Sequence, residues 1–317
     1  MSKNPPQKII IDTDPGQDDA VALLLALASP EELDVLGIVT VAGNVGLTQN
    51  SINALKIVEL SGRTDVPVFA GCDRPMRRTP VTAEHVHGKT GLDGPDLPDP
   101  EISLQDHHGV DFIIDTLLEA EPNTVKLCAL GPLTNIAMAL VRAPSIAPRI
   151  KEIVLMGGGY FEGGNITPAA EFNIYVDPEA ADIVLHCAAP ITIIPLDVTH
   201  HMLATPAHLE RFLNLGNRTG KAIYEMLTFS ERFDLEKYRW EGAPLHDPCV
   251  IAHVLEPDIF TGRHINVEVE VSSELTRGMT VADYWGVTDR KANAHYLRHG
   301  NTERYYDLLA ERISKLP

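Results

Sequence analysis

Four carboxylates lie within one short acidic turn of the chain, residues 12–19, which reads Asp-Thr-Asp-Pro-Gly-Gln-Asp-Asp. They are Asp12, Asp14, Asp18 and Asp19. The Pro-Gly pair between them predicts a tight turn, after which the second pair of acids would open a helix. Helix capping and the helix dipole account for one or two of these acids. Four acids in one turn repel one another unless a cation lies among them, so we predict a metal site.

The kinds of ligand in the acidic turn indicate which metal it would bind. Every charged donor is a carboxylate, and the turn contains no Cys or His, which favours Ca²⁺ or Mg²⁺ over zinc. An EF-hand loop does not fit, because counting from Asp12 places Gln17 where that loop needs Gly and Leu23 where it needs Glu. The first two acids also resemble the Asp-x-Asp motif of Mg²⁺ phosphatases of the haloacid dehalogenase type. That alternative stays open, although the Asp-Asp pair that follows has no evident role in phosphoryl transfer.

The acidic turn follows the first of several short apolar segments that alternate with helical patterns along the chain. Such segments indicate strands buried on both faces, and their alternation with helices indicates a mainly parallel sheet. We therefore predict an α/β, Rossmann-like fold, an open sheet with helices on both faces and the active site at the carboxyl ends of the strands. The expected strands are 8–12, 35–41, 66–69, 124–129, 153–156, 191–194 and 265–271, and the expected helices are 18–28, 47–61, 110–119, 133–141, 180–187 and 303–316.

Two stretches interrupt this alternation. Residues 71–107 are rich in Pro, Gly, His and Asp, and residues 205–245 are polar with a helical pattern. Both are expected beside the carboxyl ends of the strands, and a loop as long as the first is usually either functional or disordered. Because no internal repeat or linker divides the chain, we predict one domain over residues 1–317.

Composition and charge exclude several classes of function. Of the 317 residues, 44 are acidic and 26 are basic, and the resulting net charge of −18 repels nucleic acid and anionic membrane surfaces. The longest apolar run, from Ala20 to Ala28, is too short to span a bilayer, and the first residues contain no apolar signal core. The four cysteines form no CxxC pattern. We expect a cytoplasmic protein with reduced cysteines and a small-molecule substrate.

The acidic turn, extended to Ala20, resembles the signature of the nucleoside hydrolases, the inosine–uridine-preferring nucleoside N-ribohydrolases. The resemblance implies calcium-dependent hydrolysis of the N-glycosidic bond of ribonucleosides to ribose and free base, in nucleoside salvage, by a homodimer or homotetramer. A nucleoside- or sugar-binding protein that keeps the calcium turn without turnover is the non-enzyme alternative. Four further segments resemble that family in the same order, namely Val41-Ala42-Gly43-Asn44, Gly131-Pro132-Leu133-Thr134-Asn135, Met156-Gly157-Gly158-Gly159 with Glu171-Phe172-Asn173, and His246-Asp247-Pro248.

The resemblance also implies a role for each site residue. Asp14 would be the general base that takes the proton of the attacking water, and His246 would assist the leaving base in an oxocarbenium-like transition state. Asp12 would hold the metal ligands in position without itself binding the metal. Ca²⁺ would be held by Asp14, Asp19, Asp247 and the backbone carbonyl of Leu130, a position where family members often have Thr. The nucleoside would contact Asp18, Asn44, His87, Met156, Asn165, Glu171 and Asn173.

Several of these residues also have ordinary structural interpretations. Asn44 and Asn165 each lie beside a Gly and would be typical turn residues. Asp247 directly precedes a proline and would be a typical helix cap. The same pattern occurs at Asp177 and Thr205, which we interpret as caps only.

The segment from Glu171 to Asn173 is harder to explain by structure alone. If this segment is extended, the alternation of a strand places Glu171 and Asn173 on one side and Phe172 on the other. A lone His87 would more often be a surface residue, and Met156, at the end of a strand, would more often belong to the core.

Aromatic residues of the polar helical stretch could stack on a nucleobase. Tyr224, Tyr238 and Trp240 are the candidates, with packing between helices as the alternative interpretation. Family members that act only on purines are expected to hold the base between tryptophans. This chain has only Trp240 and Trp285, and neither lies in the long loop, so we predict a broad or inosine–uridine-preferring specificity.

Overall fold

An eight-stranded sheet runs through the computed structural model, which describes residues 5–317 and all their side chains except those of residues 233, 234, 236 and 238. Its order is β3-β2-β1-β4-β5-β6-β12-β9, and every neighbouring pair is parallel except β12 and β9. The strands are β1 (Gln7–Thr13), β2 (Leu33–Thr40), β3 (Val68–Ala70), β4 (Val125–Ala129), β5 (Glu152–Met156), β6 (Ile191–Ile194), β9 (Phe260–Ile265) and β12 (Ala294–Gly300).

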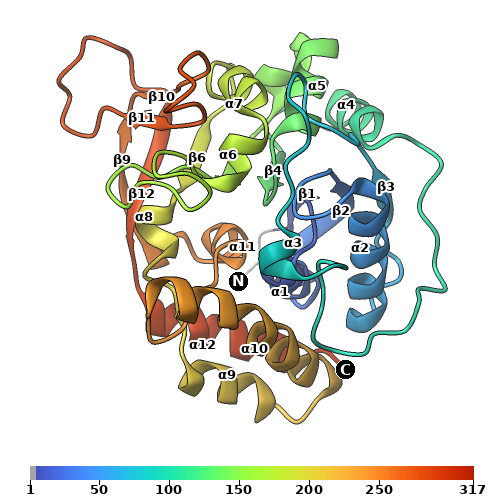
Figure 1. The fold of residues 1–317 in the computed structure, drawn as a ribbon. Coiled ribbons are helices and arrows are strands. Elements are labelled where there is room, and N and C mark those ends of the chain that lie inside the picture. Colours follow the sequence, from blue (N-terminus) through green and yellow to red (C-terminus); the bar gives the residue numbers. More distant parts are fainter. Residues whose placement is uncertain (1–4) are drawn as a thin grey trace.

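Helices cover both faces of this sheet, as predicted, and each face has its own apolar core. In Figure 1 the helices α4 (Gly109–Glu119), α5 (Thr134–Arg142) and α7 (Pro178–Leu185) lie on one side of the strands. The other side carries α1 (Gln17–Leu27), α2 (Leu47–Ser61), α9 (Pro206–Leu213), α10 (Arg218–Tyr238), α11 (Pro248–Leu255) and α12 (Thr302–Ile313).

Helix α1 is buried on all sides, which explains its composition. Residues 20–27 are all apolar and fully enclosed, because α2, α10, α11 and α12 surround them. A helix that is apolar all round belongs in the interior. The first turn of α1, with the acidic residues that it carries, is therefore held in place at the carboxyl end of β1.

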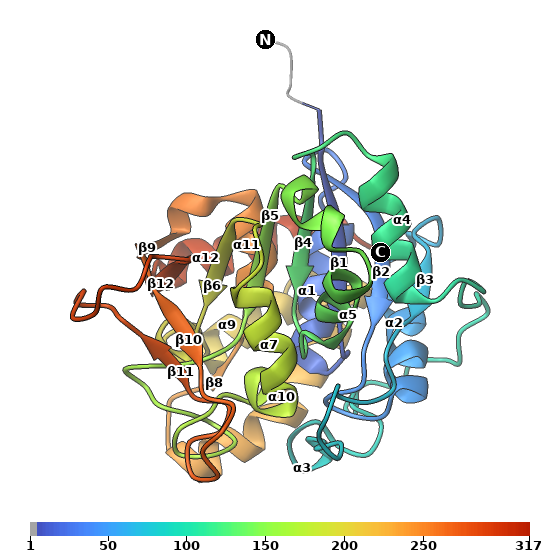
Figure 2. The ribbon, with the colours of Figure 1, turned by 90° about the horizontal axis from the view of Figure 1, so that it is seen from above.

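The carboxyl ends of the parallel strands meet at one edge of the sheet. Figure 2 shows the short helix α3 (Glu84–His87), which lies in the long loop after β3, at this edge and away from the start of β1. The smaller pair β7 (Leu203–Ala204) and β8 (Ala243–Pro244) joins the two ends of the polar helical stretch. Both interrupting stretches thus reach the edge where open α/β sheets bind ligands.

The C-terminal part differs from the prediction. The expected strand 265–271 is divided between the end of β9 and the short strand β10 (Val267–Val269), which pairs with β11 (Thr280–Ala282) outside the main sheet. Strand β12 was not predicted, because its His and Arg residues interrupt the apolar pattern by which the other strands were identified. No helix within residues 5–317 is long and apolar enough to cross a membrane.

The loop after β5 is tied to the sheet by one buried carboxylate. Asp197, in the short helix α8 (Leu196–Thr199), accepts hydrogen bonds from the backbone N–H groups of Tyr160, Phe161 and Glu162. It also accepts a hydrogen bond from the hydroxyl of Tyr296 in β12. These bonds fix the start of the loop whose later residues face the sheet edge.

Candidate functional site

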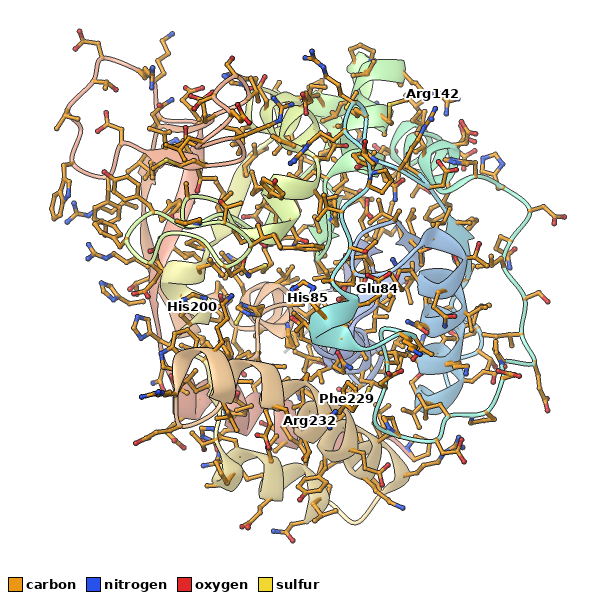
Figure 3. All side chains as sticks on the ribbon, in the orientation of Figure 1. Glu84, His85, Arg142, His200, Phe229 and Arg232 are labelled. Carbon is orange, nitrogen blue, oxygen red and sulfur yellow. The ribbon has the colours of Figure 1, made fainter. Side chains whose placement is uncertain are left out.

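A cavity opens at the carboxyl edge of the sheet. In Figure 3, His85 of α3 lies near the middle of the view and His200, which follows α8, lies to its left, with Phe229 and Arg232 of α10 below. Most of the residues predicted to form the site line this cavity: Asp14, Asp18, Asn44, His87, Leu130, Met156, Asn165, Glu171, Asn173, His246 and Asp247.

Three carboxylates form a compact cluster at the floor of the cavity. Asp18, Asp19 and Asp247 each offer an oxygen, and these oxygens lie within 4.8 Å of one another. Asp19 is fixed by its neighbours, since it accepts hydrogen bonds from the hydroxyl of Thr13 at 2.6 Å and from the backbone N–H of Gly16 at 3.0 Å. The bond to Gly16 caps α1, so Asp19 has both the structural role and the place in the cluster.

Asp247 does not act as the helix cap that its sequence suggested. It occupies the N-cap position of α11, but its side chain makes no capping hydrogen bond, and its carboxylate instead joins the cluster. Asp177, the other Asp-Pro pair, accepts the N–H of Ala180 and is a true cap, as predicted. Thr205 lies at an N-cap but contacts the ring of His208 rather than a backbone N–H.

The Asp14 carboxylate is enclosed next to this cluster. Its Oδ2 accepts the backbone N–H of Asn44 at 2.7 Å. Glycines border it on two sides, because a Cβ built on either Gly43 or Gly131 would overlap a carboxylate oxygen of Asp14. The side-chain amide of Asn44 donates to the backbone carbonyl of Asp14 and to Asp19, so this residue does more than form a turn.

The electrostatics of the cluster favour either protons or a counter-charge. Burial, followed by the charges of neighbouring carboxylates, raises the pKa of both Asp14 and Asp247 well above its usual range. Burial likewise raises the pKa of Asp18 and Asp19. Burial also raises the pKa of Asp12 to about 8, and although its Oδ1 accepts the amide of Asn135, its buried Oδ2 has no hydrogen-bond partner. A divalent cation would stabilise the ionised forms that burial disfavours.

The segment from Glu171 to Asn173 reaches the cavity in a different way from the one expected. It is not extended, so the predicted alternation is wrong. Glu171 is the N-cap of α6 (Phe172–Val176), accepts three backbone N–H groups, and has its pKa raised by burial to about 7. Asn173, in the first turn, donates to the carbonyl of Leu130 at 2.7 Å. A carbonyl oxygen has two lone pairs, so that of Leu130 keeps one for another partner.

Two histidines complete the cavity near the acidic floor. Nδ1 of His246 lies 2.7 Å from the hydroxyl of Thr199, and Nδ1 of His87 lies 2.7 Å from the side-chain oxygen of Gln17. Burial lowers the pKa of His246 to about 3 and that of His87 to about 4, so both rings are neutral at pH 7.

The remaining predicted residues are less directly placed. Asn165 lines the cavity, and its side chain accepts the N–H of Phe172, which agrees with a role in shaping the loop. Trp240 is not among the lining residues; its ring stands edge-on to His200, 4.9 Å away between ring centroids. Tyr224 packs against the apolar core. The side chain of Tyr238 lies outside the part of the chain that the structure describes.

Sequence reasoning missed several lining residues. His85, His200 and Lys237 line the cavity, and so does Gln17, the uncharged residue between Gly16 and Asp18 in the acidic turn. For His200 the signal was its position directly after a strand and short helix at the carboxyl edge. For Gln17 no pattern in the sequence distinguished it from a spacer.

Known proteins with similar sequences and structures match this chain over nearly its whole length. Residues 9–307 match the family model described as inosine-uridine preferring nucleoside hydrolase. The chain is 47% identical over 308 residues to a protein named pyrimidine-specific ribonucleoside hydrolase RihA from Photobacterium profundum, covering 96% of this chain and 98% of that protein. A structure titled purine-preferring ribonucleoside hydrolase from Gardnerella vaginalis superposes with a TM-score of 0.90 at 34% identity, covering 97% of this chain and 98% of the other. A plant nucleoside hydrolase superposes with a TM-score of 0.89 at 34% identity, covering 98% and 99%.

The raised carboxyl pKa values predict how stability depends on pH without metal. A carboxyl whose pKa is higher in the folded than in the unfolded state binds more protons when folded, so the free energy of unfolding decreases as pH rises through the folded-state pKa. For Asp12 that value is about 8. Burial raises the pKa of the Cys72, Cys128 and Cys249 thiols to about 12, which lowers stability in the same direction between pH 7 and pH 9. The lowered pKa values of the two histidines oppose this change only slightly, because few histidines of the unfolded chain are still protonated above pH 7. In a chelator, urea unfolding at pH 9 should give a free energy about 1 kcal/mol or more below that at pH 7.

Saturating Ca²⁺ should reduce this pH dependence and raise stability by about 3 kcal/mol at about 100 times its Kd. Equal stability at the two pH values in chelator, with no effect of Ca²⁺, would contradict the cluster as a cation site.

The two Asp-Pro pairs provide a matched test of the same site. Asp247→Asn removes a charge from the cluster, and we expect calcium affinity measured by calorimetry to fall by about 10–100-fold or more, the usual loss for disturbing a metal site. Asp177→Asn keeps an N-cap acceptor and should bind calcium as the wild type does. Unchanged calcium binding by Asp247→Asn would return Asp247 to an ordinary structural role.

Proposed function

The chain belongs to the inosine-uridine preferring nucleoside hydrolase family and is a nucleoside N-ribohydrolase, and we propose that it uses Ca²⁺ to hydrolyse ribonucleosides to ribose and free base. One observation carries this proposal. A single cavity has a floor of buried carboxylates and, beside it, neutral histidines and amides. This combination suits a reaction in which water attacks one side of a sugar while a base departs from the other.

The donor set fits a hard divalent cation. Asp14, Asp19, Asp247 and the carbonyl of Leu130 would hold it, and all of them are oxygen donors, which Ca²⁺ prefers in numbers of about six to eight. The Asp247 carboxylate, which joins the cluster instead of capping α11, and the remaining lone pair of the Leu130 carbonyl support this assignment. When bound, Ca²⁺ would lower the pKa of a water molecule and hold the ribose diol.

The protein's own residues supply the remaining chemistry. Asp14 would take the proton of the attacking water, since its carboxylate is held rigidly by Asn44 and by the two bordering glycines. Asp18, Asn165, Glu171 and Asn173 would bind the ribose hydroxyls, and Met156 would contact the sugar ring. A negatively charged floor would also stabilise the positive charge that develops on the ribosyl ring in the transition state.

The base would lie toward His87 and His246, on the side of the cavity formed by α3 and α10. A broad or inosine–uridine-preferring specificity is our proposal, since relatives with similar folds carry both pyrimidine-specific and purine-preferring names. Nucleoside salvage would be its role in the cell, and a homodimer or homotetramer its expected assembly.

The phosphatase alternative is disfavoured by the position of Asp12. A nucleophile must reach the substrate, but Asp12 is buried, bonded to Asn135, and absent from the cavity lining. A binding protein without turnover would not need an enclosed proton acceptor.

Incubation with inosine, uridine and a phosphate ester tests all three functions. We expect the wild type to release ribose and no phosphate. Asp14→Asn should reduce turnover by roughly 10²–10⁴-fold, because Asn keeps an oxygen but cannot accept the water's proton. Circular dichroism should show that the variant is folded. Phosphate release without ribose would favour the phosphatase, no product would favour a binding protein, and near-normal turnover by Asp14→Asn would remove it as the base.

His246→Ala tests assistance to the leaving base. The purine base of inosine is a poor leaving group and needs a hydrogen bond or proton, whereas the phenolate of a p-nitrophenyl riboside departs unaided. We expect a large loss of kcat on inosine and a small loss on the nitrophenyl riboside. Equal losses on both substrates would mean that His246 supports Asp247 and the metal instead.

A further inference from the structure

Gln17 uses both ends of its side-chain amide to hold the loop that carries α3. Its Nε2 donates to the backbone carbonyls of His87 at 2.9 Å and Asp93 at 3.2 Å, and its Oε1 lies 2.7 Å from Nδ1 of His87. Carbonyl oxygens only accept hydrogen bonds, so the two backbone contacts identify the amide nitrogen. The atom that faces the His87 ring is therefore the amide oxygen.

This contact determines where the His87 proton lies. An amide oxygen also only accepts, so Nδ1 of His87 must carry the hydrogen. A neutral imidazole has one N–H, and its other nitrogen, Nε2, then has a free electron pair. The ring cannot turn over without losing this bond, and its Nδ1–Cε1 edge packs on Gly16, where an added Cβ would lie 2.6 Å from Nδ1.

Nε2 of His87 is available to a ligand. His87 lines the cavity, and its Nε2 makes no hydrogen bond to any part of the chain that the structure describes. We propose that Gln17 is a positioning residue that keeps His87 in the Nδ1–H tautomer, so that Nε2 accepts a hydrogen bond from the bound nucleoside. The last step rests on the proposed function. Its donor is either an N–H of the base or the 5′-hydroxyl of the ribose.

His246 differs from His87 in this respect. Its Nδ1 contacts the hydroxyl of Thr199, which can donate as well as accept, so His246 is free to present an N–H to the cavity. The two histidines then have different roles. His87 in the Nδ1–H form has no proton on Nε2 to give, and assistance to the leaving base falls to His246.

The tautomer can be measured directly on the full-length protein. Selective ¹⁵N-histidine labelling and two-bond ¹H–¹⁵N correlation at pH 8 distinguish a protonated from an unprotonated ring nitrogen, and His87→Ala assigns the signals. We expect Nδ1–H in the wild type and a shift to the Nε2–H form, which histidine prefers in water, in Gln17→Met, whose side chain has a similar length. An Nε2–H signal in the wild type would overturn the proposal even if Gln17→Met does not fold.

Asn53 provides the matched control. It anchors the same region by donating to the carbonyls of Pro15 and Thr90, without touching His87. Asn53→Leu should loosen the loop and leave the His87 tautomer unchanged. If Asn53→Leu shifts the tautomer as much as Gln17→Met does, general loop anchoring rather than the Gln17 contact sets it, and the proposal fails.

Kinetics identify the donor on the substrate. In Gln17→Met the proton of His87 would lie on Nε2 and face the donor hydrogen of the nucleoside, so one hydrogen bond would be replaced by a repulsive contact. With uridine, KM should therefore rise about tenfold. The increase should disappear with 3-methyluridine if the base N–H is the donor, or with 5′-deoxyuridine if the ribose is. An equal increase for all three substrates overturns the contact with the nucleoside. Absence of hydrolysis with an intact Nδ1–H signal overturns the proposed function and supports the tautomer.

Discussion

The mutual repulsion of buried carboxylates is the constraint on which the rest of this structure depends. Asp18, Asp19 and Asp247 form a cluster with Asp14 beside it, and burial raises the pKa of each. Such an arrangement is unfavourable unless a cation, protons or hydrogen-bond donors compensate it. The site supplies some donors from Thr13, Gly16 and Asn44, and the proposed Ca²⁺ would supply the charge.

The fold brings these acids together from distant parts of the chain and holds them there. Strand β1 delivers Asp14 at its carboxyl end, the fully enclosed helix α1 delivers Asp18 and Asp19, and the start of α11 delivers Asp247. Packing of α1 directly against α11 fixes the distance between the two helix starts. A loop-based site could not resist the repulsion as well, because loops yield more easily than packed helices.

Sequence alone predicted the parallel sheet, its two helical layers and the edge that carries the site, because buried strands and helices have clear periodic patterns. It also identified the acidic turn, whose charge density has no ordinary structural explanation. It did not predict β12, whose polar residues disguise a strand, or the helical start at Glu171. The role of Asp247 could not be separated from capping by sequence, since an Asp-Pro pair looks the same whether its carboxylate turns inward or caps the helix. Gln17 was invisible for a related reason, because its partners come from a loop about seventy residues away.

The two glycines that border Asp14 have a consequence for how such an enzyme can change over evolution. Because neither Gly43 nor Gly131 leaves room for a side chain, these positions and Asp14 form a unit that tolerates no gradual variation. The wall near α3 belongs to a long surface segment, and none of the residues of α3 is buried, so substitutions there disturb little of the core. If the base lies there, as we propose, chemistry and base preference are encoded in separable parts of the chain. A new nucleoside specificity could then arise by exchanging that outer wall while the acidic centre is inherited unchanged.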